Sequence, residues 1–481
     1  MTGEPEALLS PAVLPADRLG RVHFIAIGGA GMSGIARIML KRGIPVSGSD
    51  AADSELLGQL AALGATVYVG HDAGHLGDAE TVVVSTAIRP ANPELVAARE
   101  RGLRVLHRAA ALASLMEGRT AVTVAGTHGK TTTTSMLTVV LQRAGLDPAY
   151  CIGGQLVTTG LGADDGGGDV FVAEADESDG SFLNFTPHIA VVTNVEADHL
   201  DNYGDFAEVR RSFVRFVEGI RPGGTLVAGA DDPVARELAG VARARGLTVR
   251  TYGVAPDADL RLTGFTPRGL GSSFLIEGLG ELSLAVPGRH NALDATAAVA
   301  VALALGCDFD TVRAALAEFG GARRRLELKG ETAGVQVFDS YAHHPTELAA
   351  DLTATRDYVA QRTADGASPG RIVAVFQPHL YSRTRFFGRE FGAALGGADV
   401  AVVLDVYGAR EDPEPGVTGR LVADAITGDG TEVVYEPVWE EVPARVAGLA
   451  RPGDVVLTLG AGDVTRLGPL ILDRLAARDP E

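Results

Sequence analysis

Short runs of β-branched and aliphatic residues alternate with alanine-rich helical stretches along the first quarter of the chain. Residues 22–28 and 81–88 read VHFIAIG and TVVVSTAI, and stretches of helical character surround them. This alternation is typical of βαβ units on a parallel sheet. The segment up to residue 118 is therefore predicted to be one α/β domain.

Two further series of strand-like runs follow, which predicts an α/β fold of three domains. The second series covers 120–126, 169–176 and 188–196, and the third covers 335–340, 371–377, 400–406, 432–436 and 454–460. A chain of 481 residues is long enough for about three domains of ordinary size. We expect the domains to cover 1–118, 119–324 and 325–481.

Three other segments have predicted local structures. The run ATAAVAVALALG at 295–306 is too short to span a bilayer and is interpreted as a buried helix. The arginine-rich stretch at 320–331 is interpreted as a hinge or linker. The glycine-rich and aspartate-rich stretch at 162–169 is interpreted as a loop.

Composition narrows the class of protein. A net charge of −19 argues against general nucleic-acid binding, which needs a basic face. The N-terminus has no basic segment before an apolar stretch, which argues against a secretory signal. Cys151 and Cys307 lack metal-binding spacing. A cytoplasmic protein without disulfides is the expectation.

A GxGxxG pattern at Gly29, Gly31 and Gly34 follows the first strand-like run and opens a helix-like segment. Glycines there let the backbone approach a diphosphate at a helix N-terminus. Asp50 stands 19 residues past Gly31, where an acid that binds ribose would lie. The pattern fits NAD, FAD or another nucleotide diphosphate, with close packing of strand and helix as the alternative. Its context favours a nucleotide.

The stretch GTHGKT, from Gly126 to Thr131, resembles a Walker A turn with a shortened first half, since Val124 replaces the expected glycine. Lys130 can reach the β and γ phosphates, and the Thr131 hydroxyl can hold Mg²⁺. The chain has only three lysines, and one of them, Lys130, lies in this glycine turn. An ordinary capped helix start would not explain a lysine at this position. The stretch therefore predicts ATP binding.

Four acids follow a strand-like run: Glu174, Asp176, Glu177 and Asp179. Clustered carboxylates repel one another unless a cation compensates them, and Mg²⁺ suits such oxygen ligands. Glu174 is the preferred ligand because it ends a buried run, whereas Glu177 and Asp179 can be solvated loop acids. His199 ends the neighbouring run, and its pattern leaves a metal-binding and a structural role both open.

Eight ordered motifs resemble the Mur ligase family of cell-wall peptide synthesis, and the resemblance covers the chain from about residue 20 to residue 465. They are GGAGMSG, AGTHGKTTTTSM, EADESDGSF, TNVEADHLD, PGRHNALDA, DSYAHHPTE, FQPHLYSRT and DVYGAREDPEPGVTG. The resemblance implies an N-terminal Rossmann-like domain for a UDP-sugar, a central P-loop ATPase domain, and a C-terminal Rossmann-like domain for an amino acid. It implies ATP and Mg²⁺ as cofactors, and UDP-N-acetylmuramate and L-alanine as substrates.

The resemblance also implies roles for individual residues. Metal binding would fall to Thr131, Glu174 and His199. Nucleotide contacts would come from Gly126, Thr127, His128, Gly129, Lys130, Thr131, Thr132, His290, Asn291 and Arg325. Substrate contacts would come from Gly29, Ala30, Gly31, Met32, Ser33, Asp50, His71, Ser85, Thr86, His379, Tyr381, Ser382 and Arg383. The residues expected to be catalytic are Lys130, Glu174, His199, Arg325, Asp339 and His344. Residues expected to support the amino-acid side are His343, Asp405, Tyr407, Arg410 and Glu411.

Three positions depart from the family pattern. Asp294 replaces the second asparagine of HNxxN, and a carboxylate can only accept hydrogen bonds. Ser340 replaces one acid of the family's DDY, which leaves Asp339 as the sole acid of that pair. Phe213 stands where several sister ligases carry a carbamylated lysine.

The expected chemistry is ATP-dependent amide formation through an acyl phosphate, since a free carboxylate has no leaving group. The attacking amine of the amino acid must lose a proton. Three histidines are chemically able to accept it: His199, His344 and His379. Closure of the third domain after ATP binding is expected, because it would keep water from the acyl phosphate. The alternatives are a recycling ligase that adds a tripeptide, a nicotinamide-dependent oxidoreductase, and a nucleotide-gated binding protein.

Overall fold

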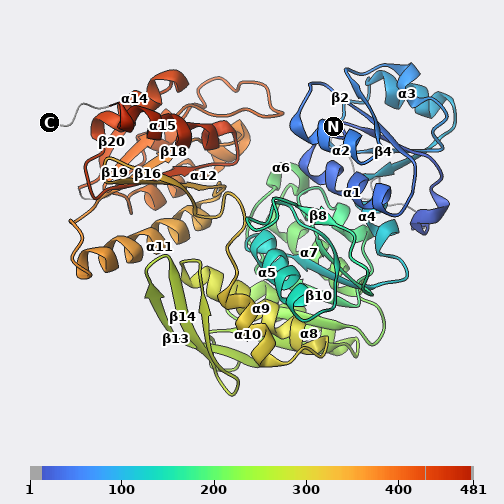
Figure 1. Cartoon of the computed structure of the whole chain (residues 1–481), viewed down its shortest axis with the longest axis horizontal. Coiled ribbons are helices and arrows are strands. Elements are labelled where there is room, and N and C mark those ends of the chain that lie inside the picture. The colour runs from blue at the N-terminus through green and yellow to red at the C-terminus, as the bar shows by residue number, and fades with distance from the viewer. Residues whose placement is uncertain (1–12, 428–429, 478–481) are drawn as a thin grey trace. The chain divides into compact units, whose positions relative to one another are not determined.

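The computed structural model describes residues 13–427 and 430–477, and its strands form three sheets of five, ten and six strands (Figure 1). Helices connect most of the parallel strands, so the predicted α/β fold is confirmed. The chain groups into two compact units. The first runs to Thr263 and adds Ile276–Gly280 and Leu293–Leu316; the second holds Gly264–Leu275, Glu281–Ala292 and the chain from Ala317. The domain boundaries at 118 and 324 stay predictions.

The first sheet is parallel, with the order β3-β2-β1-β4-β5. The chain moves outward from β1 on one side and then on the other, so the glycine turn after β1 lies where the strand order reverses. Its strands are β1 Val22–Ile25, β2 Val46–Asp50, β3 Thr66–Val69, β4 Thr81–Val84 and β5 Arg104–His107. Its helices are α1 Ala30–Lys41, α2 Glu55–Ala62, α3 Pro93–Glu100 and α4 Arg108–Met116.

The second sheet has the order β15-β14-β13-β12-β11-β10-β6-β9-β7-β8. Its first strands are β6 Thr120–Ala125, β7 Ala149–Cys151, β8 Ala163–Asp164, β9 Val170–Glu174 and β10 Ile189–Val192. The others are β11 Thr225–Gly229, β12 Thr248–Gly253, β13 Leu260–Arg268, β14 Gly271–Ile276 and β15 Gly280–Leu284. The stretch 162–169 is therefore not merely a loop, because β8 pairs antiparallel with β7.

Three helices of this region, α5, α7 and α8, begin at a capping side chain or a glycine. Asp205 and Asp232 accept backbone hydrogen bonds at the starts of α7 and α8, whereas α5 begins after Gly129. The helices are α5 Lys130–Arg143, α6 Leu200–Tyr203, α7 Phe206–Glu218, α8 Pro233–Ala244, α9 Arg289–Ala304 and α10 Phe309–Ala317. The buried helix predicted at 295–306 is confirmed over 295–302, where the residues of α9 are buried.

The third sheet has the order β16-β17-β21-β18-β19-β20 and is parallel apart from the β16 pairing. Its strands are β16 Glu327–Thr332, β17 Val335–Ser340, β18 Ile372–Phe376, β19 Val400–Val403, β20 Glu432–Tyr435 and β21 Val455–Leu459. The interpretation of 320–331 as a linker is wrong from Glu327 onward, because hydrogen bonds to β17 make this segment an edge strand.

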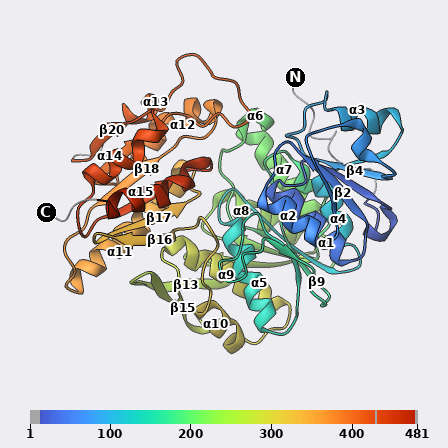
Figure 2. The same cartoon turned by 45° about the horizontal axis from the view of Figure 1, so that its top comes forward.

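Helices cover both faces of the third sheet (Figure 2). They are α11 Pro345–Ala364, α12 Tyr381–Leu395, α13 Arg420–Ala423, α14 Val442–Leu449 and α15 Leu467–Ala476. Ile372, Ala374 and Phe376 of β18 belong to the core that includes α11 and α12 residues. Val373 and Val375 belong to the core of α14 and α15. Successive side chains of the fully buried strand β18 thus point to opposite faces of the sheet and pack into two different cores.

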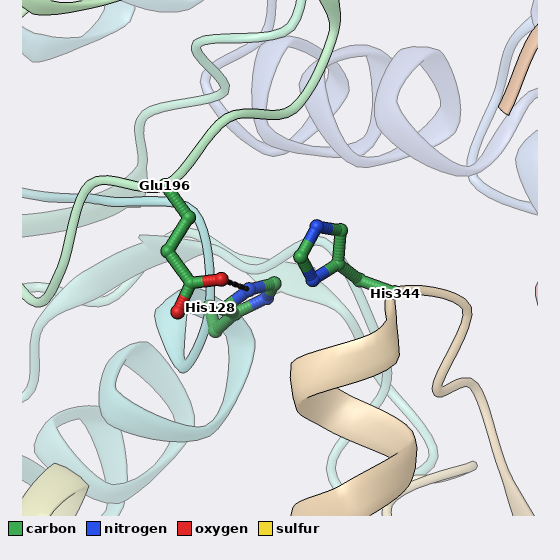
Figure 3. Close-up of side chains that lie close together, drawn as sticks. All are labelled: His128, Glu196 and His344. Atoms are coloured by element: carbon green, nitrogen blue, oxygen red, sulfur yellow. Dashed lines mark ion pairs between the residues drawn. The ribbon is translucent and has the colours of Figure 1, made fainter. Parts of the chain in front are cut away.

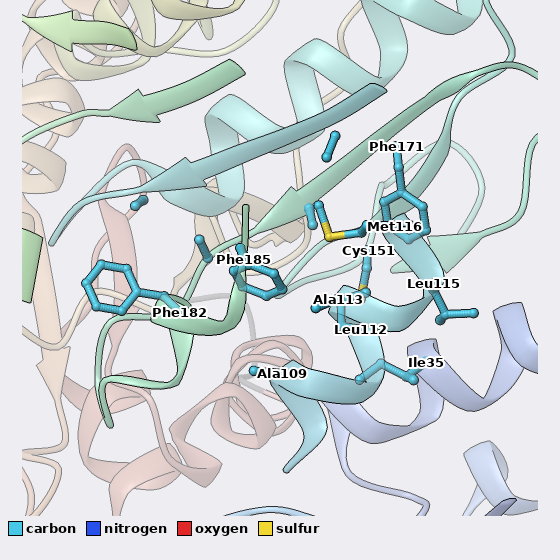
Figure 4. Close-up of a cluster of buried hydrophobic side chains, with 14 of the residues drawn as sticks. Ile35, Ala109, Leu112, Ala113, Leu115, Met116, Cys151, Phe171, Phe182 and Phe185 are labelled. Atoms are coloured by element: carbon cyan, nitrogen blue, oxygen red, sulfur yellow. The ribbon is translucent and has the colours of Figure 1, made fainter. Parts of the chain in front are cut away.

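One core joins the first two sheets within the first unit (Figure 4). Ile35 of α1 and Met116 of α4 belong to the same buried cluster as Cys151 of β7 and Phe171 of β9. Burial raises the pKa of the Cys151 thiol to about 12, so it behaves as an apolar group. Among the described residues, no helix is long and apolar enough to cross a membrane.

The third glycine of GxGxxG is required for packing in this core. A Cβ atom at Gly34 would lie 2.9 Å from the Cβ of Ala163 and 3.5 Å from Cys151 Sγ. Gly34→Val is expected to destabilise the first unit by about 1–3 kcal/mol, the usual cost of overpacking. Thermal and urea unfolding of the purified variant would measure the loss.

Gly58 supplies the matched control for this prediction. It lies in α2, and a Cβ atom there would meet nothing within 4 Å. Gly58→Ala should be neutral or stabilising by about 0.5–1 kcal/mol, since alanine is the better helix former. Equal stability of Gly34→Val and the wild type would contradict the packing role of Gly34.

Candidate active site

The loop between β6 and α5 has a backbone that requires glycine at two positions. Gly126 has φ 132° and Gly129 has φ 83°, both in a region that other residues rarely adopt. A Cβ atom at Gly126 would lie 2.0 Å from Thr193 Oγ1, and one at Gly129 would lie 2.4 Å from Asp294 Oδ1. The loop leads directly into α5, whose first amides lack acceptors within the helix and suit an anion.

Residues 193–196, which follow β10, hold this loop in place. The Thr127 amide donates to the Asn194 carbonyl over 2.9 Å, and the His128 amide donates to Asn194 Oδ1 over 2.9 Å. The Thr193 hydroxyl donates to the His128 carbonyl over 2.6 Å. Sequence reasoning missed Asn194, because its role depends on the pairing of β10 with β6.

Lys130 is held over the loop by three acceptors. Its ammonium donates to two carbonyl oxygens of the loop, over 2.6 and 3.1 Å, and to Glu177 Oε1 over 3.0 Å. Burial lowers the pKa of Lys130, but nearby carboxylates, chiefly Glu177 and Glu174, more than offset this and raise it. The ammonium therefore stays charged at neutral pH.

Glu177 and Asp179 are not the solvated loop acids that the sequence suggested. Glu177 is 2% exposed, and the side chain of Asp179 is 7% exposed. Burial raises the pKa of Glu177, and the adjacent Lys130 works against that rise. Asp179 accepts a hydrogen bond from the Thr86 hydroxyl over 3.4 Å. Both acids are buried because segments distant in sequence fold over them.

Thr131 and Glu174, two of the predicted metal ligands, are in contact. The Thr131 hydroxyl donates to Glu174 Oε2 over 3.0 Å, and the Gly153 amide donates to the same oxygen over 2.9 Å. Hydroxyl and carboxylate oxygens are the donors that Mg²⁺ prefers. These two groups, beside the helix N-terminus and Lys130, fit a magnesium ion that accompanies a bound nucleotide.

His199, the third predicted ligand, has a left-handed backbone with φ 54° and stands at the N-terminal end of the short helix α6, without a side-chain cap. Its Nε2 atom lies 3.5 Å from Asp198 Oδ2 and 3.8 Å from Glu177 Oε1. The imidazole therefore faces carboxylates of the acidic cluster. This position is compatible with the predicted role near a cation, which stays a prediction.

Figure 3 shows two imidazoles that belong to different compact units. His128 Nε2 lies 3.5 Å from Glu196 Oε2 within the first unit. His344 caps α11 in the second unit, where its Nδ1 accepts from the Thr346 amide over 3.4 Å. An accepting Nδ1 leaves the proton of the neutral His344 imidazole on Nε2.

Asp339, predicted to be catalytic, lies in the interior with 0% exposure. Its carboxylate accepts from the hydroxyls of Thr458 and Thr465 over 2.8 and 2.7 Å. Arg324 donates to it over 3.2 Å and also to the Gly460 carbonyl over 2.6 Å. In this structure Asp339 positions Arg324, while Arg325 lies 3.9 Å from Glu347 Oε1.

His379 is surrounded by aromatic and cationic groups. Its ring stacks on Tyr407, with centroids 5.8 Å apart. Burial, together with the charges of His343, Arg383, Arg410 and Arg324, lowers the pKa of His379 to about 3. A neutral imidazole with so low a pKa is a weak proton acceptor. The next helix, α12, begins at Tyr381, and the Ser382 amide donates to Glu411 Oε2 over 2.9 Å.

The altered HNxxN motif begins α9. The Asn291 side chain donates to the Pro287 carbonyl over 2.6 Å, and His290 Nε2 lies 3.8 Å from Asp351 Oδ1. Asp294 accepts from the Thr133 hydroxyl over 3.2 Å and lies behind Gly129. A carboxylate can only accept hydrogen bonds, and the Thr133 hydroxyl of α5 supplies the donor that Asp294 needs.

The N-terminal glycine turn is tied to Asp50. The Gly28 amide donates to Asp50 Oδ2 over 2.9 Å. A Cβ atom at Gly31 would lie 3.1 Å from Arg108 Nη1, and Arg108 pairs with Asp176 over 2.6 Å. Sequence reasoning placed Gly28 in the glycine turn but missed Arg108. Arg108 brings a cation to the turn where a diphosphate is predicted.

The other predicted substrate residues occupy several environments. The side chain of Met32 is 3% exposed and belongs to the core, so it does not face a ligand. Ser33 is 9% exposed, and Ser85 directly follows β4. The side chain of Ala30 lies outside the described residues. Thr132 and Arg383 are buried in the first turns of α5 and α12.

A glycine loop with a lysine at the helix start, and a carboxylate at the end of the adjacent strand, define a nucleotide-dependent α/β enzyme of the P-loop type. The chain belongs to the Mur ligase family, whose models match as "Mur ligase family, catalytic domain" over residues 21–120, "Mur ligase middle domain" over 124–302, and "Mur ligase, glutamate ligase domain" over 324–462. The family resemblance of the sequence is thereby confirmed.

Individual relatives are similar over nearly their whole length. The UDP-N-acetylmuramate–L-alanine ligase of Thermobifida fusca is 60% identical, covering 95% of this chain and 97% of that protein. The protein of the same name from Acidothermus cellulolyticus is 57% identical, covering 97% of each chain. The crystal structure of UDP-N-acetylmuramate-alanine ligase from Thermotoga maritima is 29% identical with a TM-score of 0.78, covering 94% and 98%.

The loop geometry predicts a large effect of a single methyl group at Gly126. Gly126→Ala combines an unfavourable φ with a clash against Thr193 Oγ1, so ATP affinity should fall by about tenfold or more. Calorimetric titration with a non-hydrolysable ATP analogue would measure it.

Gly118 is the matched control, because it has φ 81° but nothing within 4 Å of its Cβ position. Gly118→Ala should cost about 1–2 kcal/mol of stability and leave ATP affinity unchanged. Wild-type affinity in Gly126→Ala would rule out the strained loop as a requirement for binding.

Proposed function

We propose that the protein joins L-alanine to the lactyl carboxylate of UDP-N-acetylmuramate, with conversion of ATP to ADP and phosphate, in peptidoglycan precursor synthesis. The similarity to L-alanine ligases over nearly the full chain carries this proposal. The Lys130 loop supports it by supplying the nucleotide chemistry that amide formation requires.

The reaction needs ATP because a carboxylate is a poor electrophile. The lactyl carboxylate attacks the γ-phosphorus, which forms an acyl phosphate and releases ADP. The amine of L-alanine then attacks the acyl carbon, and phosphate leaves as the amide forms. The protein therefore has to bind and orient the three substrates and neutralise the phosphate charges, rather than supply a nucleophile.

The central loop is proposed to hold the triphosphate. The amides at the start of α5 and the ammonium of Lys130 would neutralise the β and γ phosphates. Lys130 would exchange its contacts with loop carbonyls and Glu177 for phosphate oxygens. Thr131 and Glu174 would hold Mg²⁺, with His199 close by, and the bound ion would offset developing phosphate charge.

The domains predicted at 1–118 and 325–481 are proposed to present the two other substrates. Gly29–Ser33, with Asp50, would bind the diphosphate and ribose of the UDP-sugar. Arg108 would add a positive charge there. The amino acid would be bound by α12 and the residues before α11.

Two observations narrow the choice of the group that would accept the proton from the amine of L-alanine. His379 is a weak base because its pKa is lowered to about 3. Neutral His344 has its proton on Nε2, because Nδ1 caps α11. An accepting His344 would therefore need to release its cap. The reaction is expected in the cytoplasm, where the nucleotide substrates are made available.

The first test of this function is ADP release with ATP, Mg²⁺ and UDP-N-acetylmuramate. L-alanine, glycine, L-serine, the cell-wall tripeptide and no amine would be compared. Turnover should be fastest with L-alanine. Turnover only with the tripeptide would contradict the proposal and favour a recycling ligase, and ATP binding without turnover would favour a binding protein.

Lys130→Ala is expected to lower kcat at least about 100-fold, because no other ammonium contacts the described loop. Lys329→Ala is its control, since Lys329 pairs with Glu327 on β16. The control should keep wild-type turnover. Comparable rates for Lys130→Ala and the wild type would exclude Lys130 from phosphate neutralisation.

Removal of Mg²⁺ with EDTA should abolish ADP release, and Thr131→Ala should raise the Mg²⁺ concentration needed for half-maximal activity by about tenfold. Thr134→Ala is the control, because its hydroxyl donates to the Lys130 carbonyl within the same helix. The rate of ADP release would be measured against Mg²⁺ concentration for the wild type, Thr131→Ala and Thr134→Ala. The same shift in both variants would indicate a general effect on α5.

A further inference from the structure

A fully buried carboxylate lies behind the ligand-binding edge of the first sheet. Glu94, the second residue of α3, has 0% exposure. Its Oε2 accepts from Ser49 Oγ over 2.6 Å and faces His71 Nδ1 at 3.2 Å. Its Oε1 faces His75 Nδ1 at 3.0 Å and the Asp72 amide at 3.4 Å.

This carboxylate is charged. Burial raises the pKa of Glu94, but the adjacent His23 imidazole and hydrogen bonds from Ser49 and His75 outweigh it and lower the pKa to about 2. The second residue of α3 also benefits from the helix dipole. A buried charge with this many donors fixes the orientation of the groups around it.

The donors lie at the edge of the sheet where nucleotides bind in such folds. Ser49 and Asp50 end β2, His71 follows β3, and Glu94 follows β4. The side chains of His71 and His75 are 23% and 22% exposed, whereas Glu94 is covered by them. Glu94 therefore acts on a ligand through these residues.

The order of strands places the parts of a nucleotide. The glycine turn for the diphosphate follows β1, and Asp50, at the end of the adjacent strand β2, suits the ribose. The next strand outward is β3, and His71 follows it after Gly70. A nucleotide that extends in one direction from the turn reaches His71 with its base.

Glu94 decides which nitrogen of His71 carries the proton. His71 Nδ1 faces the Glu94 carboxylate and lies 3.0 Å from Ser49 Oγ, which donates its single proton to Glu94. Both neighbours can only accept from His71, so Nδ1 must be protonated. Nε2 of the neutral ring is left as a hydrogen-bond acceptor, and nothing described in the protein donates to it.

We propose that Glu94 is a positioning residue for the UDP-sugar, which holds His71 in the tautomer whose Nε2 accepts a hydrogen bond from the N3–H group of the uracil ring. Cytosine has no proton at N3, so the same pair would select uridine over cytidine nucleotides. This inference rests on the proposed function of the site.

Glu94→Gln tests the inference with almost no change in shape. The amide oxygen should face the Asp72 amide, because a backbone N–H can only donate. The amide NH₂ then faces His71, whose Nδ1 must accept, so its proton moves to Nε2. The expected result is a rise of about tenfold in KM for UDP-N-acetylmuramate and in the Kd for UDP, with kcat and the KM values for ATP and L-alanine unchanged.

Two further measurements separate tautomer control from a loss of structure. The preference for UDP over CDP, measured by calorimetry, should fall in Glu94→Gln. The nitrogen-15 signals of His71, assigned with His71→Gln, should show protonated Nδ1 in the wild type and protonated Nε2 in Glu94→Gln. An unchanged tautomer or an unchanged nucleotide preference would overturn the inference.

His75→Phe is the matched control. It removes the donor to the other oxygen of Glu94 and keeps an aromatic ring for the stack on Tyr68, whose centroid lies 4.2 Å away. It should leave KM for UDP-N-acetylmuramate within about twofold of the wild type. An equal rise in His75→Phe would overturn the inference by showing a general disturbance of the sheet edge.

Failure of the inference is distinguishable from failure of the proposed function. If wild-type protein forms product from L-alanine and Glu94→Gln behaves identically, the function stands and the inference is wrong. If wild-type protein neither binds UDP nor forms product, the function itself is wrong.

Discussion

The buried ammonium of Lys130 is the constraint on which the candidate active site depends. A cation inside a protein is costly unless carboxylates and carbonyl oxygens replace its water. Here two loop carbonyls and Glu177 do so, and the loop carbonyls point at Lys130 because two glycines allow the turn. In a chain of net charge −19, this local balance creates a place where a polyanion can bind.

The first two sheets present their candidate functional residues at the carboxyl ends of their parallel strands. In the first sheet the glycine turn, Asp50 and Glu94 lie there, and in the second the Lys130 loop and Glu174 do. The buried strands supply rigidity, and the connections after them carry the functional side chains. These residues lie together because parallel strands have all their carboxyl ends on the same edge of the sheet.

Several residues acquired their roles from packing. Glu177 reads as a loop acid in sequence, yet burial makes it the partner of Lys130. Asp339 is predicted to be catalytic from the sequence, yet two hydroxyls and Arg324 bind its carboxylate oxygens in the interior. Asp294 departs from the family motif, and only the approach of α9 to α5 shows that Thr133 is its donor.

The sequence by itself determined the α/β class, most strands, the buried helix α9, the phosphate-binding loop and the family, because these depend on local periodicity and on motifs of adjacent residues. It also indicated Thr131 and Glu174 as a pair of oxygen ligands. Tertiary structure alone decided the partners of Lys130, the burial of Glu177 and Asp339, and the tautomer of His71. The physical reason is that burial and hydrogen-bond partners arise between residues far apart in the chain, and no spacing within one segment encodes them.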